Sequence, residues 1–230
     1  MQKYYFVGQQ NGQRAVQQVP AERIDAGQRS VHQNVLDLLN VKYVISPYPI
    51  PEATMQQVGQ VSHTVGNQQV PLGIFENKNV LPRAFLVGDF QQFDYPKALL
   101  SQLTSPQLDP RQQVLLYEAP AVAPIPDSTA TAEITEYGLH EIRVKTTAAQ
   151  PQLLVLSDTH YPPGWHATVD GEPADILQAN HAFRAVALPA GKHELVFRYE
   201  SSGFRLGFWL TMISSVLVAG LLVLGWRRSK

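Results

Sequence analysis

Apolar residues follow three different patterns along this chain of 230 residues. Over residues 31–39 they recur at helical spacing, and a β-type run follows at residues 41–46. In the second half of the chain they alternate with polar residues, as in strands with one buried face. Near the C-terminus they form a long stretch without a charged residue. The patterns predict an α+β part, an all-β part and an apolar helix, in that order.

Residues 1–118 are predicted to form a small α+β module. A second helix is predicted at residues 95–103, and further strands are predicted at residues 71–77, 83–89 and 113–118. Residues 119–127 contain three prolines. Proline stiffens and extends a chain and cannot join the interior of a sheet, so this segment is predicted to be a linker between two domains.

Residues 128–203 are predicted to form a β-sandwich of the jelly-roll or Ig-like type. Short alternating strands follow one another with turn signals every 8 to 12 residues or so, which is typical of a sandwich. They are predicted at residues 132–138, 139–147, 152–158, 165–171, 182–189 and 193–200. Asp170-Gly171 is a strong hairpin signal, because a type I′ turn needs positive φ at both central residues.

Residues 204–226 are predicted to be a single transmembrane helix. The stretch LGFWLTMISSVLVAGLLVLGW has no charge, and at about 1.5 Å per residue it can cross a hydrocarbon core of roughly 30 Å. Phe208, Trp209 and Trp226 fit the aromatic belts at the two interfaces. Arg227, Arg228 and Lys230 follow directly, so residues 227–230 are predicted to be a cytoplasmic tail.

Charge and composition narrow the classes of partner. The chain has 18 Lys and Arg against 19 Asp and Glu, and every acidic residue precedes Phe204. The part before the helix is therefore mildly acidic, which argues against nucleic acid as a partner. The chain has no cysteine, so disulfides and thiolate metal sites are excluded.

The first residues, MQKYYFVGQQNGQRAVQQ, contain no apolar segment that could export the following domains. Two arrangements remain open on this basis. The chain is either a tail-anchored protein that faces the cytoplasm, or the C-terminal portion of a longer membrane protein whose earlier helices carried it across.

Three stretches carry a family resemblance: NVLDLLNVKYVIS (34–46), LPRAFLV (81–87) and LSDTHYPPGWHATVDGEPADILQANHAFRAVALPAGKHELVFRYES (156–201). With the terminal helix, they resemble the YfhO family of bacterial multi-spanning membrane proteins, which look like GT-C-type glycosyltransferases. The resemblance implies an extracytoplasmic C-terminal region that ends in a helix with a cytoplasmic terminus. It also implies that the catalytic acidic residues lie in early extracytoplasmic loops, so no catalytic residue is predicted in this chain.

One loop is a candidate ligand site. Tyr161 and Trp165 flank a Pro-Pro-Gly turn, where their rings could stack on a sugar, and Asp158, His160 and Asn180 could bond its hydroxyls. The favoured interpretation is structural: Trp165 caps the sandwich core, and the loop only directs the chain. A contact of the flanking aromatic residues with a glycan or a lipid headgroup is the second interpretation.

The remaining polar residues indicate no further chemistry. Asp158, Asp170, Glu172 and Asp175 are interpreted as turn or solvent-facing positions and not as a catalytic pair. The histidines have no short ligand spacing beyond Asp158-x-His160, so neither a metal nor a cofactor is predicted. Arg83 is expected to pair with a carboxylate.

The leading hypothesis is a non-catalytic extracytoplasmic part of a glycosyltransferase-like envelope protein, anchored in the bacterial cell membrane. Its expected partners are the lipid bilayer, a polyprenyl-linked sugar or envelope glycan, and the transmembrane part of a longer parent protein. The alternative is a stand-alone membrane-anchored β-sandwich that binds glycans or envelope partners. Whether the parent protein is an enzyme stays open.

Overall fold

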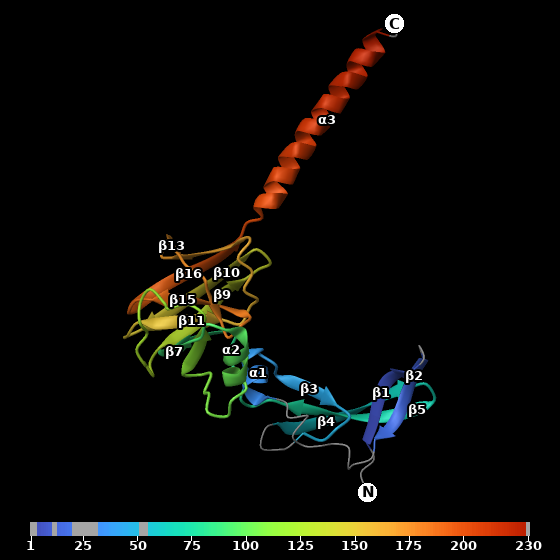
Figure 1. Cartoon of the computed structure of the whole chain (residues 1–230), viewed down its shortest axis with the longest axis vertical. Coiled ribbons are helices and arrows are strands. Elements are labelled where there is room, and N and C mark those ends of the chain that lie inside the picture. Colours follow the sequence, from blue (N-terminus) through green and yellow to red (C-terminus); the bar gives the residue numbers. More distant parts are fainter. Residues whose placement is uncertain (1–3, 11–12, 20–31, 51–54, 229–230) are drawn as a thin grey trace.

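The computed structural model describes residues 4–10, 13–19, 32–50 and 55–228. Figure 1 shows a β-rich head, an arm of strands on one side of it, and a long helix that projects from the other side. Most of the predicted module before residue 31 and the last two residues of the predicted tail lie outside the described residues. The predicted fold class is confirmed: the chain is mostly β-sheet, with a small helical part and one apolar C-terminal helix.

Two sheets form the head. One has the strand order β13-β12-β16-β10-β9. Its strands are β9 (Thr131–Tyr137), β10 (Glu141–Ala148), β12 (Trp165–Val169), β13 (Glu172–Ala174) and β16 (Gly191–Tyr199). The other has the order β6-β11-β15-β14-β8-β7. Its strands are β6 (Ala84–Val87), β7 (Asp89–Gln92), β8 (Gln113–Leu116), β11 (Gln152–Leu156), β14 (Leu177–Ala179) and β15 (Phe183–Leu188).

The apolar run of β11 explains how the head is layered. All five residues of this strand are buried. Leu154 and Leu156 pack between the two sheets, with Leu195 and Phe197 of β16 on the facing side. Leu153 and Val155 point to the opposite face of their own sheet. A strand that is covered on both faces reads as a continuous apolar run and not as an alternation.

Two helices cover that opposite face. They are α1 (Gln33–Leu38) and α2 (Pro96–Leu103), which lie close together beneath the head in Figure 1. Leu38, Leu99 and Leu103 pack in the same apolar cluster as Leu153. The head therefore has three layers: a sheet, a second sheet and a helical layer.

The sheets do not follow the domain ranges that the sequence predicts. β6, β7 and β8 precede the proline-rich segment at residues 119–127, yet they share a sheet with β11, β14 and β15. All four residues of β6 pair with β11, from Leu153 to Leu156. Strands from residues 1–118 and from residues 128–203 therefore share one sheet. Within the second range alone, β11 and β14 would each keep β15 as a partner and would lose β6 and β8, respectively.

The hairpin prediction is confirmed. Asp170 and Gly171 connect β12 to β13 with φ angles of 54° and 90°.

The arm is a further sheet, of order β3-β5-β4, built from β3 (Tyr43–Ser46), β4 (Gln56–Val65) and β5 (Gln68–Glu76). A separate hairpin joins β1 (Tyr4–Gln10) to β2 (Gln13–Val19).

The last element is α3 (Ser202–Arg228). Its segment Leu206–Arg227 is long and apolar enough to span a membrane, and none of it is buried in the protein. In Figure 1 this helix stands clear of the head. Two residues, Glu200 and Ser201, separate it from the end of β16.

The shared sheet generates a test of the domain ranges. We expect a fragment of residues 128–203 to lack a cooperative urea transition, because β11 loses β6 and the helical layer. A fragment of residues 32–203 retains both and should unfold cooperatively, as followed by circular dichroism. A cooperative transition in the shorter fragment would contradict the three-layer account.

Candidate functional site

The candidate site lies where the head meets α3. Trp165, the first residue of β12, pairs with Tyr199, the last residue of β16. The backbone N–H of Glu200 donates to the carbonyl oxygen of Gly164 at 2.7 Å. The loop at residues 157–164 is therefore tied directly to the chain that continues into the apolar helix.

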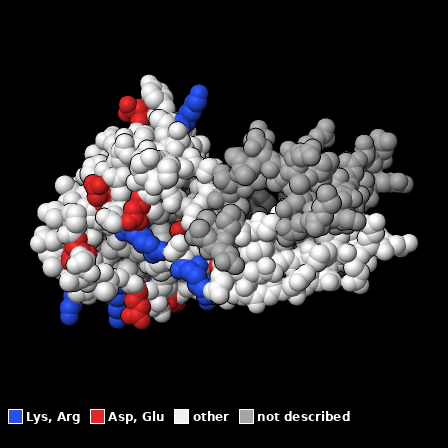
Figure 2. All heavy atoms as spheres, turned by 90° about the horizontal axis from the view of Figure 1, so that it is seen from below, with Lys and Arg blue, Asp and Glu red and all other residues white. Residues whose placement is uncertain are grey.

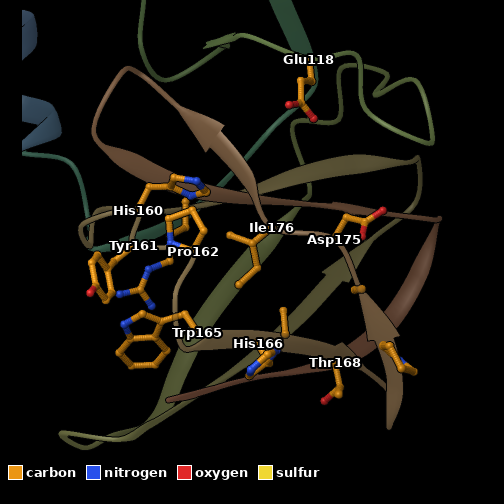
Figure 3. A pocket seen from close by; sticks show the side chains of 13 residues that line it. Glu118, His160, Tyr161, Pro162, Trp165, His166, Thr168, Asp175 and Ile176 are labelled. Carbon is orange, nitrogen blue, oxygen red and sulfur yellow. The ribbon is translucent and has the colours of Figure 1, made fainter. Parts of the chain in front are cut away.

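A cavity of about 700 Å³ opens beside this loop. Figure 3 shows Tyr161 and Trp165 on one side of it and Asp175 on the other, with Ile176 between them. The lining residues come from the loop, β12, β13, β15 and the segments next to them. They are Glu118, His160, Tyr161, Pro162, Trp165, His166, Ala167, Thr168, Pro173, Ala174, Asp175, Ile176 and Arg184.

Arg184 and Trp165 form the centre of the lining. The guanidinium carbon of Arg184 lies 3.8 Å from the centroid of the Trp165 ring, within the range of a cation–π contact. Arg184 is 3% exposed, and its Nε donates to the carbonyl oxygen of Thr159 at 2.9 Å. Its Nη1 has no hydrogen-bond partner among the described residues. Burial lowers the pKa of Arg184, but an arginine stays protonated in proteins, so the cavity wall holds a cation.

The aromatic rings at this end are held in place by packing. The Trp165 and Tyr199 ring centroids are 5.5 Å apart. Gly164 has φ of 139°, and a Cβ at this position would lie 2.6 Å from the Tyr199 ring. Glycine is therefore required here both by the backbone conformation and by the close approach of the ring. Tyr161 is exposed at the edge of the cavity.

His160 is a neutral polar group of the lining. Burial and the nearby Arg184 charge lower the pKa of His160, and Glu118 opposes this shift. Its backbone N–H donates to the carbonyl oxygen of Ala182 at 2.7 Å. Within the described part of the chain, its Nδ1 is buried without a partner.

Asp158 does not line the cavity. Its carboxylate accepts a hydrogen bond from Arg83 Nη1 at 2.9 Å and another from the Tyr137 hydroxyl at 3.0 Å. The expected carboxylate partner of Arg83 is therefore Asp158, on the loop that carries Tyr161. This cluster fixes the start of the loop.

Asn180 also lies outside the cavity lining. It is 3% exposed, and its Oδ1 accepts a hydrogen bond from the backbone N–H of Leu115 at 3.0 Å. Its φ of 46° lies in the left-handed region, which asparagine tolerates better than most residues. Asn180 thus connects β8 to the β14–β15 turn and has a structural role.

Asp170 also has structural partners. Asp170 accepts hydrogen bonds from His193 Nδ1 at 2.7 Å and from the backbone N–H of Glu194 at 2.8 Å.

Among the residues that the structure describes, no group of three His, Asp or Glu side chains could hold a metal ion. Seen from below in Figure 2, basic and acidic side chains are interspersed over the head, so this face offers no field of one sign to a polyanion.

Of the predicted site residues, the structure brings Tyr161, Trp165 and His160 together and leaves out Asp158 and Asn180. Sequence reasoning missed Arg184, Glu118 and Thr168. Arg184 had a detectable signal, because it is the single charged residue in the strand Ala-Phe-Arg-Ala-Val-Ala-Leu. A charge in such a strand requires an unusual environment.

The role of Asn180 can be tested by Asn180→Ala. The substitution leaves the N–H of Leu115 unpaired and places alanine at positive φ, so we expect the free energy of unfolding to fall by about 1–3 kcal/mol. Urea denaturation measures this loss. A variant as stable as the unaltered protein would contradict the structural role.

The depressed pKa of His160 predicts a pH dependence. As the pH falls below about 6.5, the unfolded chain binds a proton at this residue that the folded chain binds only at lower pH. Stability is therefore lost as the pH falls towards the folded-state pKa. In His160→Gln the loss between about pH 7.5 and 5.5 should be smaller, as measured by urea unfolding. Equal losses in both proteins would contradict the shift.

Comparison with known proteins identifies the region around this site. Residues 127–211 match the family model described as "Bacterial membrane protein YfhO". No curated protein and no solved structure matches the chain. The match covers the Gly-Trp, Asp-Gly and Pro-Ala-Gly motifs and the beginning of α3. The resemblance is thus confirmed for residues 127–211, which match a YfhO-family membrane protein region, while the stretches at residues 34–46 and 81–87 lie outside the match.

Proposed function

We propose that this chain is the non-catalytic, extracytoplasmic part of a glycosyltransferase-like membrane protein, and that its cavity positions a lipid-linked sugar or a glycan acceptor in envelope glycosylation. The observation that carries the proposal is the Trp165–Arg184 pair in a cavity at the end of the head that leads into α3. The family match and the apolar helix support membrane association.

The lining chemistry fits a sugar that carries a negative charge. Tyr161 offers an exposed ring at the edge for stacking on a sugar face. Glu118, Asp175 and Thr168 offer oxygen atoms for its hydroxyls. Arg184 supplies a cation that none of the ion pairs in the described part of the chain neutralises. A phosphate on the sugar would supply the missing partner.

The position of the cavity fits a ligand that is itself tied to the membrane. Tyr199 packs on Trp165 and is three residues before Ser202, where α3 begins. Three extended residues span at most about 11 Å, so the cavity cannot lie far from the helix start. Arg227, Arg228 and Lys230 favour a cytoplasmic C-terminus, which puts the head outside the cell.

The test is binding of a soluble sugar 1-phosphate and of its neutral methyl glycoside to the full chain in detergent. Trp209→Phe and Trp226→Phe leave Trp165 as the only tryptophan, so that its fluorescence reports the cavity. We expect the phosphorylated sugar to bind more tightly. Arg184→Gln should remove that preference, a loss of about 1.5–3 kcal/mol, or 10- to 150-fold in affinity.

Tyr161→Ala supplies a second variant whose folding is not at risk, because this side chain is exposed. It should weaken binding of both ligands about 2- to 10-fold through loss of stacking. Tyr95→Ala removes another exposed tyrosine, which precedes α2 and does not line the cavity, and should leave binding unchanged. No fluorescence response to either sugar, or equal responses of the Tyr161 and Tyr95 variants, would overturn the proposal.

A further inference from the structure

Exposed apolar side chains are unevenly distributed over the head. Across residues 127–201, all of which are described, the large hydrophobic or aromatic side chains that are exposed are Tyr137, Leu139 and Tyr161. Leu139 is 90% exposed at the tip of the β9–β10 turn. A single exposed apolar side chain is ordinary, but several such side chains grouped at one place are informative.

All three residues lie at the end of the head next to α3. The turn of Leu139 is held there because the N–H of Tyr199 donates to the carbonyl oxygen of His140 at 2.8 Å. The loop of Tyr161 is held there by the bond from the Glu200 N–H to the Gly164 carbonyl. The Tyr137 hydroxyl donates to Asp158 on the same loop.

The opposite end of the same strands is different. Its turns are formed by residues 149–151, 170–171 and 189–190, which are Ala, Gln, Pro, Asp and Gly. None of these turn residues is a large apolar residue, but Ile125, which is 47% exposed, lies beside the first turn, because its N–H donates to the carbonyl oxygen of Pro151 at 2.9 Å. The α3 end thus exposes Tyr137, Leu139 and Tyr161, of which Leu139 is almost fully exposed, and this grouping argues for a partner at that end.

Chain length identifies that partner. The segment able to span a membrane begins at Leu206, seven residues after Tyr199. Three extended residues and four helical residues cover at most about 17 Å. The apolar tip is thus within reach of the boundary between headgroups and acyl chains. Tyrosine suits that boundary, since its ring is apolar and its hydroxyl is polar.

Two basic residues at this end are each paired with a carboxylate, which favours such a contact. Arg83 pairs with Asp158 at 2.9 Å, and Arg198 pairs with Glu141 at 2.8 Å. A paired charge is cheaper to bring near a low-dielectric phase than an isolated one.

We propose that the β9–β10 turn and the 157–164 loop form a second membrane contact beside α3. Leu139 enters the bilayer at the headgroup–acyl boundary, and Tyr137 and Tyr161 lie at headgroup level. The lipid bilayer is the occupant of this surface. The contact prevents the head from pivoting on the Glu200–Ser201 connection and holds the Trp165 cavity against the membrane surface. It does not depend on any ligand of the cavity.

The experiment uses the absence of cysteine from the chain. Leu139→Cys gives a unique site for a bimane label, and the exposure of this side chain makes the substitution harmless to the core. Ala190→Cys, in the turn just before β16 at the opposite end, is the matched control. The full chain is placed in phosphatidylcholine nanodiscs with or without lipid that carries a nitroxide at the fifth acyl carbon.

We expect the nitroxide lipid to quench the label at residue 139 several-fold more than the label at residue 190. Aqueous iodide should show the reverse order. Equal and weak quenching by the lipid at both residues would overturn the proposal. So would protection of residue 139 from both quenchers, because that result assigns the surface to a second copy of the chain. Sugar binding in detergent is measured separately, so failure of either proposal leaves the other standing.

Discussion

The double-sided burial of β11 is the constraint on which the head depends. Leu154 and Leu156 fill the space between the sheets, while Leu153 and Val155 need a second cover from the helical layer. A sandwich of two sheets would leave that second face exposed to water. Each large apolar side chain left in water forfeits roughly 1.5–3 kcal/mol, which is a substantial part of the stability of a domain. The strands β6, β7 and β8 and the helices α1 and α2, which precede residue 119, therefore pack with the strands that follow it.

This layering also explains where the cavity lies. Most residues of β15 are buried on both faces of the strand. Arg184 is the second residue of β15 and lies between the two sheets, where the Trp165 ring covers it. At this end the 157–164 loop connects β11 of one sheet to β12 of the other. The loop is fixed by Asp158 at one end and by Gly164 at the other. Tyr161 lies between these two fixed points, so the exposed ring stands on an anchored loop.

Several elements could be predicted because local signals and tertiary packing agree. The Asp-Gly turn sets the β12–β13 hairpin, and the apolar helix near the C-terminus needs no partner to be recognised. β4 was missed because its residues are polar and mostly exposed, so burial leaves no pattern in them. The pairing of β6 with β11 could not be read from the sequence either. It joins residues about 70 positions apart, and the three prolines of residues 119–127, which lie between the two strands, indicate a boundary equally well.

The same limit applies to the site. Asp158 and Asn180 have the side chains that a sugar site needs, and only the fold shows that Arg83 and the Leu115 N–H already occupy them. The Arg83–Asp158 pair has a consequence for the cavity. Arg83 binds the carboxylate of Asp158, which is the residue before Thr159 on the loop. Arg184 donates a hydrogen bond to the carbonyl oxygen of Thr159. If Asp158 were free to pair with Arg184, the buried cation would be neutralised inside the protein. Arg83 and Tyr137 bind Asp158 directly, so Asp158 acts on Arg184 through its charge. The direct contacts that Arg184 makes are the face of the Trp165 ring and the carbonyl oxygen of Thr159.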